Sequence, residues 1–193
     1  MPLALDIALL LPDPVAALAV ELNRRLDDGE PGRLRLNGTH LPHITLVQLF
    51  AREESLAELC RQVDRSVAAV GAPDLRVSGL DDQSGTAMLV FEENRELVAL
   101  HRALMDAVRA FEVPGGLDAF LTEGDLPARD RDVAWVGGYR AEHAYEHYRP
   151  HVTVGHGREA GPVDPFTFSA DRLAVCHLGR HCTCRRVLHE RRL

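Results

Sequence analysis

The amino-acid sequence predicts an α+β fold with antiparallel sheets. Strand-like and helix-like segments are mixed along the chain, and two pairs of strands are separated only by short polar turns, as in hairpins. Hairpin turns join antiparallel strands, whereas a doubly wound parallel sheet needs long crossover connections. A chain of 193 residues with 46% apolar residues has enough apolar material to fill one compact core.

The first quarter of the chain predicts a strand, a helix and a second strand. Residues 3–11 are almost all apolar, Asp13 can cap a helix, and Pro14 suits the first helical position. Apolar residues then recur at helical spacing up to the expected helix end at Asp28-Gly29, namely Val15, Leu18, Leu22 and Leu26. The second strand is expected over residues 40–50.

The middle of the chain predicts a helix, a hairpin and a longer helix. The first of these helices has an apolar face that starts at Leu56, and we expect it to stop at Gly71-Ala72-Pro73. Residues 75–80 and 86–91 are typical strands joined by a polar turn. Asn94 is expected to cap the longer helix, which should end before Pro114.

The last third of the chain predicts a loop, a short helix and further strands. Residues 114–132 are rich in glycine, proline and charge, which favours a surface loop. A short helix is expected over residues 141–148, and strands over residues 133–139, 151–155, 173–178 and 182–188. Gly179-Arg180 is interpreted as the two-residue turn of a final hairpin.

Charge and hydropathy exclude several classes of partner. A net charge of -7 and a pI near 5.8 argue against binding long duplex DNA. The N-terminal apolar run lacks the basic start of a signal peptide, and no apolar run reaches membrane-spanning length. We therefore expect a cytoplasmic monomer without a membrane partner. Its four cysteines are then reduced thiols, namely Cys60, Cys176, Cys182 and Cys184.

One short motif occurs twice, as Pro42-His43-Ile44-Thr45-Leu46 and as Pro150-His151-Val152-Thr153-Val154. Side chains alternate along a strand, so in each copy the imidazole and the hydroxyl share one face while aliphatic side chains anchor the other. Two such strands facing each other would form a pocket with two acid/base groups and two hydroxyl donors. That set suits cleavage of a phosphate ester, which needs a base on one side of phosphorus and an acid on the other.

The paired motifs and the order of the elements resemble the two-histidine (2H) phosphoesterase superfamily, which includes bacterial 2'-5' RNA ligase-like proteins and cyclic nucleotide phosphodiesterases. The resemblance implies a bilobal α+β fold with a pseudo-twofold axis, in which two antiparallel β-sheets surround a central cleft and helices pack outside. It implies one domain over residues 1–193, with each lobe contributing one motif strand, residues 42–46 and 150–154.

The same resemblance implies an activity. The expected reaction is hydrolysis of a 2',3'-cyclic phosphate to a 2'-phosphate, or reversible joining of a 2'-5' linkage, without a metal or another cofactor. The substrate would be an RNA end or a small cyclic nucleotide. By analogy with the family, His43 donates a proton and His151 accepts one, although the sequence alone does not assign the two roles. Thr45 and Thr153 would donate hydrogen bonds to the nonbridging phosphate oxygens.

The chain departs from the family at one position in each motif. Many members carry a basic residue shortly after the motif, where this chain has Gln48 and His156. His156 is therefore a candidate substrate contact, as are Arg149, Arg158 and Tyr148. Trp135 and Tyr139 are, like Tyr148, candidates for stacking on a base, with burial in the core as the ordinary interpretation.

Two other functions fit parts of the sequence. The segment His143-Ala144-Tyr145-Glu146-His147 matches H-x-x-E-H, a zinc peptidase signature in which two histidines bind Zn²⁺ and Glu146 acts as base. The ligand types in Cys176-His177 and in residues 181–184 could also hold Zn²⁺, although buried thiols are the preferred interpretation. A non-catalytic module that binds phosphorylated RNA ends is the other alternative.

Overall fold

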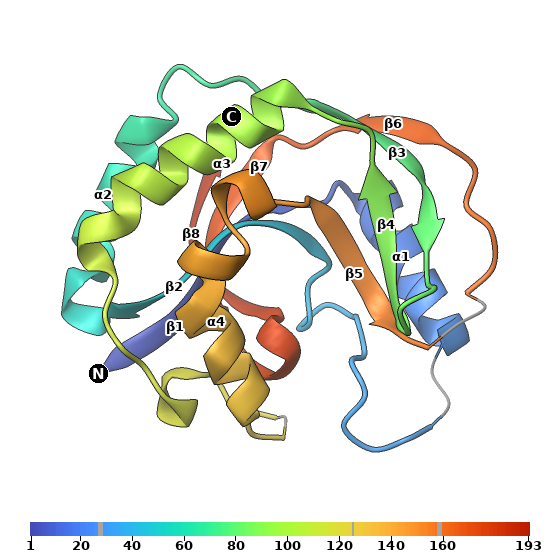
Figure 1. Ribbon diagram of the computed structural model, residues 1–193, viewed down its shortest axis with the longest axis horizontal. Coiled ribbons are helices and arrows are strands. Elements are labelled where there is room, and N and C mark those ends of the chain that lie inside the picture. Colours follow the sequence, from blue (N-terminus) through green and yellow to red (C-terminus); the bar gives the residue numbers. More distant parts are fainter. Residues whose placement is uncertain (27–28, 125, 158–159) are drawn as a thin grey trace.

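The computed structural model describes residues 1–26, 29–124, 126–157 and 160–193, and their strands form two antiparallel four-stranded sheets (Figure 1). The first sheet has the order β2-β1-β7-β8, with β1 Pro2–Leu10, β2 His43–Arg52, β7 Arg172–Leu178 and β8 Cys184–Arg192. The second has the order β5-β4-β3-β6, with β3 Asp74–Asp81, β4 Thr86–Phe91, β5 His151–His156 and β6 Phe166–Ser169. The predicted α+β class is confirmed.

The two motif strands occupy equivalent places in the two sheets. β2 and β5 are both edge strands, and each pairs antiparallel with one neighbour, β1 or β4. Each pairing contains a bulge directly after the motif threonine, because Leu46 and Val154 are the residues skipped in the register. Bulges re-aim neighbouring side chains and are frequent beside active sites. The duplication predicted from the motifs therefore extends to the backbone.

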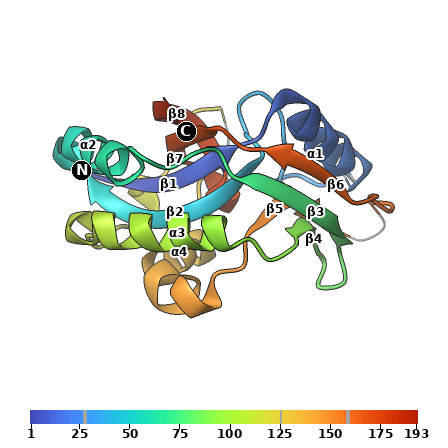
Figure 2. The same cartoon turned by 90° about the horizontal axis from the view of Figure 1, so that it is seen from above.

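The helices cross from one lobe to the other. α1 (Asp13–Leu26) follows β1 in the chain but packs against β5, and α3 (Arg95–Val108) follows β4 but packs against β2 (Figures 1 and 2). α2 (Leu56–Ser66) packs on α3, and α4 (Asp130–Glu142) packs on β2. Each sheet is thus covered by a helix that belongs to the other lobe's part of the chain, which ties the lobes together.

The core lies between these helices and the sheets. The aliphatic side chains of the motif strands that point away from the motif face are fully buried, namely Ile44, Leu46, Val152 and Val154. The cap of α3 forms as predicted, because the side chain of Asn94 accepts a hydrogen bond of 2.8 Å from the backbone N–H of Leu97. No helix in the described ranges is long and apolar enough to cross a membrane.

The strand predicted over residues 133–139 is wrong, because these residues form most of α4. Val133, Trp135 and Val136 favour strands on propensity alone. The helix nevertheless begins here because the carboxylate of Asp132 accepts the backbone N–H of Arg129 at 2.8 Å and pairs with its guanidinium. The predicted short helix over residues 141–148 contains only the end of α4 and a 3-10 turn at Tyr145–His147.

Other predicted boundaries shift. β2 starts at His43, three residues after its predicted start, and α2 ends at Ser66, well before Gly71. The predicted end of α1 falls on residues 27–28, outside the described residues. The loop over residues 114–132 is partly buried through Phe120 and contains the start of α4.

The two-residue turn predicted at Gly179-Arg180 is also wrong. A 3-10 turn at Arg180–Cys182 joins β7 to β8. Such a hairpin turn needs a positive φ, but the φ of Gly179 is -113° and the positive values fall on His181 and Cys182.

Candidate active site

The two motif histidines are held in the same way. Nδ1 of His43 lies 2.8 Å from the carbonyl oxygen of Leu41, and Nδ1 of His151 lies 2.8 Å from that of Arg149. In both copies the carbonyl belongs to the residue before the motif proline. Because a carbonyl only accepts, Nδ1 carries a proton in each ring and Nε2 is left for other chemistry. In both imidazoles Nε2 is therefore the nitrogen that is not bound to a backbone carbonyl.

The bulges behind the motifs are also supported in equivalent ways. A bulge residue loses ladder partners, so its carbonyl needs another donor. The carbonyl of Leu46 accepts from Nδ1 of His101 on α3 at 2.6 Å, and the carbonyl of Val154 accepts from Nδ2 of Asn23 on α1 at 2.7 Å. Both donors are buried. Each crossover helix thus fixes the motif strand of the lobe that it covers.

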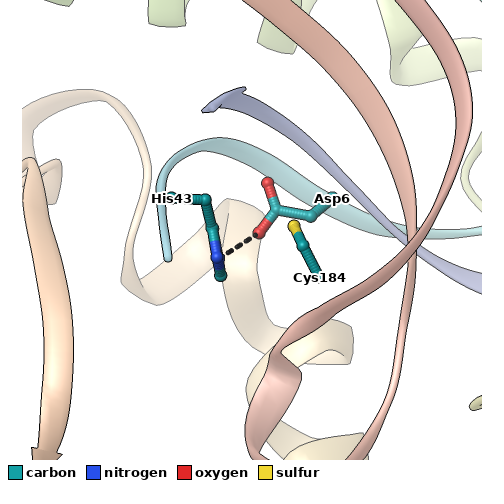
Figure 3. A group of neighbouring side chains, drawn as sticks. All are labelled: Asp6, His43 and Cys184. Atoms are coloured by element: carbon teal, nitrogen blue, oxygen red, sulfur yellow. Dashed lines mark ion pairs between the residues drawn. The ribbon is translucent and has the colours of Figure 1, made fainter. Parts of the chain in front are cut away.

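Asp6 on β1 is the residue of the site that the sequence analysis missed. It is completely buried, and its Oδ2 accepts hydrogen bonds of 2.7 Å from the hydroxyl of Thr45 and from the side-chain amide of Gln48. The same oxygen lies 3.5 Å from Nε2 of His43 (Figure 3). A carboxylate within an otherwise apolar strand was the available signal, since such a group is buried only with partners.

Asp6 separates the protonation behaviour of the two histidines. Burial disfavours the charged form of His43, but the nearby Asp6 carboxylate outweighs burial, so the pKa of His43 is raised. Burial lowers the pKa of His151, and the positive charge of His43 lowers it further. The strands that carry the two rings, β2 and β5, are in contact. At any given pH, His43 therefore carries a positive charge more readily than His151 does.

A cavity of about 170 Å³ opens beside the motif strands. It is lined by Thr45, Trp135, Tyr139, His143, His147, Tyr148, Arg149 and His151. His43 and Thr153 are partly buried and lie outside this lining, although β2 and β5 approach each other across the middle of the molecule (Figure 1). The cavity thus brings together one motif histidine, the threonine of the other motif and a mixed aromatic and basic wall.

Comparison with known proteins agrees with this geometry. The family model of the 2'-5' RNA ligase superfamily matches residues 11–177. The chain belongs to this superfamily, the 2H phosphoesterases. No curated protein matches it at the sequence level.

Solved structures of low sequence identity share the fold of this superfamily member. TT0787 of Thermus thermophilus has a TM-score of 0.67 and 18% identity over 99% of this chain and 98% of its own. E. coli LigT complexed with phosphate has a TM-score of 0.56 and 16% identity over 100% and 98% of the two chains. E. coli LigT complexed with 3'-AMP has a TM-score of 0.57 and 18% identity over 100% and 99%.

The predicted substrate contacts of this 2H protein lie in different places. Arg149 lines the cavity, and its guanidinium Nη1 donates to the carbonyls of Glu146 and Tyr148 at 2.9 Å each. Tyr148 also borders the cavity, but its hydroxyl donates to the carbonyl of Thr45 and its ring stacks on His101 at 3.8 Å. Arg158 lies outside the described residues.

His156 lies outside the cavity wall at the far end of β5. Its ring centroid is 5.2 Å from that of His181. Burial, followed by the nearby Arg129 charge, lowers the pKa of His156. The structure therefore places this residue in a second histidine pair and not beside His151.

The zinc peptidase geometry does not form. Tyr145 has a φ of 55° and interrupts the helix, so His143 and His147 are not one helical turn apart. His143 stacks on Trp135 at 3.7 Å, and Glu146 pairs with Arg102 at 3.1 Å. Within the described residues, this segment contributes to no group of three potential metal ligands.

The cysteines and histidines near the C-terminus do not gather as one ligand set either. His177 and His181 bond through Nε2 to the carbonyls of Ala119 and Gly32, at 2.9 and 2.8 Å. Cys176 and Cys184 are buried, as is Cys60 in α2. Cys184 alone of this stretch joins a group of three potential ligands in the described chain, together with Asp6 and His43 (Figure 3).

Proposed function

We propose that this 2H phosphoesterase hydrolyses a 2',3'-cyclic phosphate to a 2'-phosphate, with His43 as general acid and His151 as general base. The reaction uses side chains alone. The single observation that carries the proposal is the matched presentation of two imidazoles whose Nδ1 atoms are both bound to a backbone carbonyl. Opposite pKa shifts on the two rings support the proposed roles of His43 as acid and His151 as base.

The proposed steps balance protons between the two rings. Nε2 of neutral His151 takes a proton from water as the water oxygen attacks phosphorus. The bond from phosphorus to the 3' oxygen breaks, and Nε2–H of charged His43 protonates that oxygen. The product carries a 2'-phosphate and a 3'-hydroxyl. After the reaction, His151 releases its proton to solvent and His43 takes one up, which restores the starting state.

Charge that develops on the nonbridging oxygens needs donors. The hydroxyl of Thr153 and the guanidinium of Arg149, which borders the cavity beside His151, are the proposed donors. Thr45 currently donates to Asp6, so its predicted contact with phosphate requires the hydroxyl to exchange Asp6 for a phosphate oxygen. The half-exposed ring of Trp135 is the proposed surface for stacking a base.

The size of the cavity and the ligands of the fold relatives support the proposed substrate class. The cavity of about 170 Å³ is small, so the proposed substrate places its cyclic phosphate there and leaves the rest of the nucleotide outside, whether it is an RNA end or a free cyclic nucleotide. E. coli LigT, which shares the fold, is known in complexes with phosphate, 3'-AMP, ATP and NADP+. Binding of a phosphorylated nucleotide is therefore proposed here, and reversible 2'-5' ligation is a second activity to assay.

The experiment is multiple-turnover hydrolysis of a nucleoside 2',3'-cyclic phosphate in the presence of a chelator. His43→Ala and His151→Ala should each lower kcat by at least about 100-fold, as expected for loss of a general acid or base. His147→Ala, which changes a cavity-lining histidine without a role in the proposal, should keep kcat within about 3-fold, a change under about 1 kcal/mol. Equal losses in all three variants would contradict the assignment.

The same assay separates the enzyme from a module that only binds phosphorylated RNA ends. A binder would retain affinity for a 2'-phosphorylated nucleotide without releasing product beyond one equivalent.

The pH profile of kcat gives a further test. It should rise through the lowered pKa of His151 and fall through the raised pKa of His43. A flat profile across neutral pH would contradict two coupled imidazoles.

A further inference from the structure

Nitrogen, oxygen and sulfur atoms that can bind a metal lie close together around His43. One ligand atom each of Asp6, His43 and Cys184 lies within 4.8 Å of the other two, and the three residues come from β1, β2 and β8 (Figure 3). Asp6 and Cys184 are completely buried, whereas the His43 side chain is 14% exposed. Nitrogen, oxygen and sulfur donors together match the ligands that Zn²⁺ accepts in proteins.

The surroundings of these atoms resemble the outer shell of a metal site. A histidine that binds a metal usually donates its other N–H to a carbonyl or carboxylate, and Nδ1 of His43 already lies 2.8 Å from the carbonyl of Leu41. The Asp6 carboxylate is oriented by hydrogen bonds from Thr45 and Gln48. Nε2 of His43 and Oδ2 of Asp6 are 3.5 Å apart, close to the separation of two ligands on one tetrahedral zinc ion.

One atom of the group is otherwise unexplained. Oδ1 of Asp6 is buried and accepts no hydrogen bond from any described residue. A buried carboxylate oxygen without a partner is costly. A cation bound by both carboxylate oxygens would give Oδ1 a partner, and the charge of Zn²⁺ would be balanced by one carboxylate and one thiolate.

We propose that Asp6, His43 and Cys184 form a Zn²⁺ site that switches off the enzyme when occupied. On binding, the Cys184 thiol and Nε2–H of charged His43 each release a proton to solvent, and the freed Nε2 lone pair of His43 binds the ion. The fourth position is left to water. Because Nε2 can hold either a proton or the metal, the ion and the proposed acid role exclude each other. The inhibition, but not the binding, rests on the proposed function.

Binding is tested on the intact protein with Co²⁺, whose absorption reports both a thiolate ligand and tetrahedral geometry. One equivalent of Co²⁺ should give a thiolate charge-transfer band that Zn²⁺ abolishes by competition. Cys184→Ser should lose this band, and Cys60→Ser, which removes a cysteine on α2, should keep it. Absence of the band in the wild type, or its survival in Cys184→Ser, would overturn the site.

A second measurement needs no variant and distinguishes the nearby thiols. The ¹¹³Cd chemical shift rises with each thiolate bound, so the proposed site should give the signature of one sulfur ligand. A signature of two or three sulfurs would overturn the proposed ligand set in favour of one that includes Cys176 or Cys182. Because it uses the wild type, this test holds even where Cys184→Ser does not fold.

Inhibition is tested separately. Zn²⁺ should lower the rate of hydrolysis at least about 10-fold, and a chelator should restore it. Half-inhibition of Cys184→Ser, measured against its own metal-free rate, should need at least about 10-fold more Zn²⁺ than half-inhibition of the wild type. Co²⁺ binding by a protein that hydrolyses nothing would leave the site standing and refute the proposed function. Hydrolysis that Zn²⁺ leaves unchanged or accelerates would refute the switch.

Discussion

Replacing Asn23 by alanine is the sharpest test of how the fold holds its motif strands. The side chain of Asn23 makes three buried hydrogen bonds. Its Nδ2 donates to the carbonyls of Leu34 and Val154, at 2.9 and 2.7 Å, and its Oδ1 accepts the backbone N–H of Leu36 at 2.8 Å. One side chain therefore connects α1 with the segment before β2 and with the bulge of β5.

The size of the effect follows from what Asn23→Ala leaves behind. Two carbonyls and one N–H lose their partner, and each buried unpaired group costs about 1–3 kcal/mol. Alanine returns roughly 0.5 kcal/mol through its higher helix propensity. Because relaxation reduces the sum, we expect the free energy of unfolding to fall by about 3–5 kcal/mol. This is a large share of the 5–15 kcal/mol, roughly, that stabilises a typical domain.

Urea unfolding followed by circular dichroism measures this change. The midpoint should fall while the slope with denaturant stays the same, since the native surface is little altered. Gln62→Ala is a matched control on α2, because the Gln62 side chain is only partly buried and its oxygen accepts hydrogen bonds from the guanidinium of Arg65. It should change stability by less than about 0.5 kcal/mol. A loss below about 1 kcal/mol for Asn23→Ala would refute the account, because the three groups would then have found other partners.

Three further predictions concern titratable groups. His101→Phe should cost about 2–4 kcal/mol, since His101 donates to a bulge carbonyl and accepts the N–H of Tyr145. Burial lowers the pKa of His101, so the stability that this residue contributes is present above about pH 6.5 and is lost as the pH falls. In urea titrations the free energy of unfolding of the variant should therefore fall less on acidification than that of the wild type. Asp6→Asn should lower the pKa of His43 and move the alkaline limb of the rate profile to lower pH; an unmoved limb would exclude Asp6 as the cause. Thr86→Asp should raise the pKa of His151, measured by NMR titration of the ring.

The sequence predicts the repeated features well and the connecting ones poorly. The strands of both motifs and the cap at Asn94 follow from local patterns, and the structure confirms them. The helix over residues 133–139 does not follow from a local pattern, because their propensity favours a strand and the helix forms through the cap between Asp132 and Arg129. A short-range contact between two charged side chains decides the element there, and such contacts leave no periodic signal.

The sequence predicts the site residues that lie within each motif, but not those that other strands and helices contribute. The alternation within a strand places His43 and Thr45 on one face, but no pattern along the chain shows that Asp6 pairs with them from another strand. Asn23 likewise looks like an ordinary polar helix residue. Its role depends on the packing of α1 against the other lobe, which only tertiary structure defines.

The two lobes share a backbone arrangement and differ at one position on which the proposed chemistry depends. Counted from the bulges, Asp6 opposite Gln48 in the first sheet is equivalent to Thr86 opposite His156 in the second. One lobe thus carries a carboxylate where the other carries a hydroxyl. If the two positions were the same, the two imidazoles would have similar pKa values, and only a minority of molecules would hold one charged ring and one neutral ring. The buried carboxylate of Asp6 removes that equivalence, and in the proposed mechanism this lets a duplicated fold hold an acid and a base at the same pH.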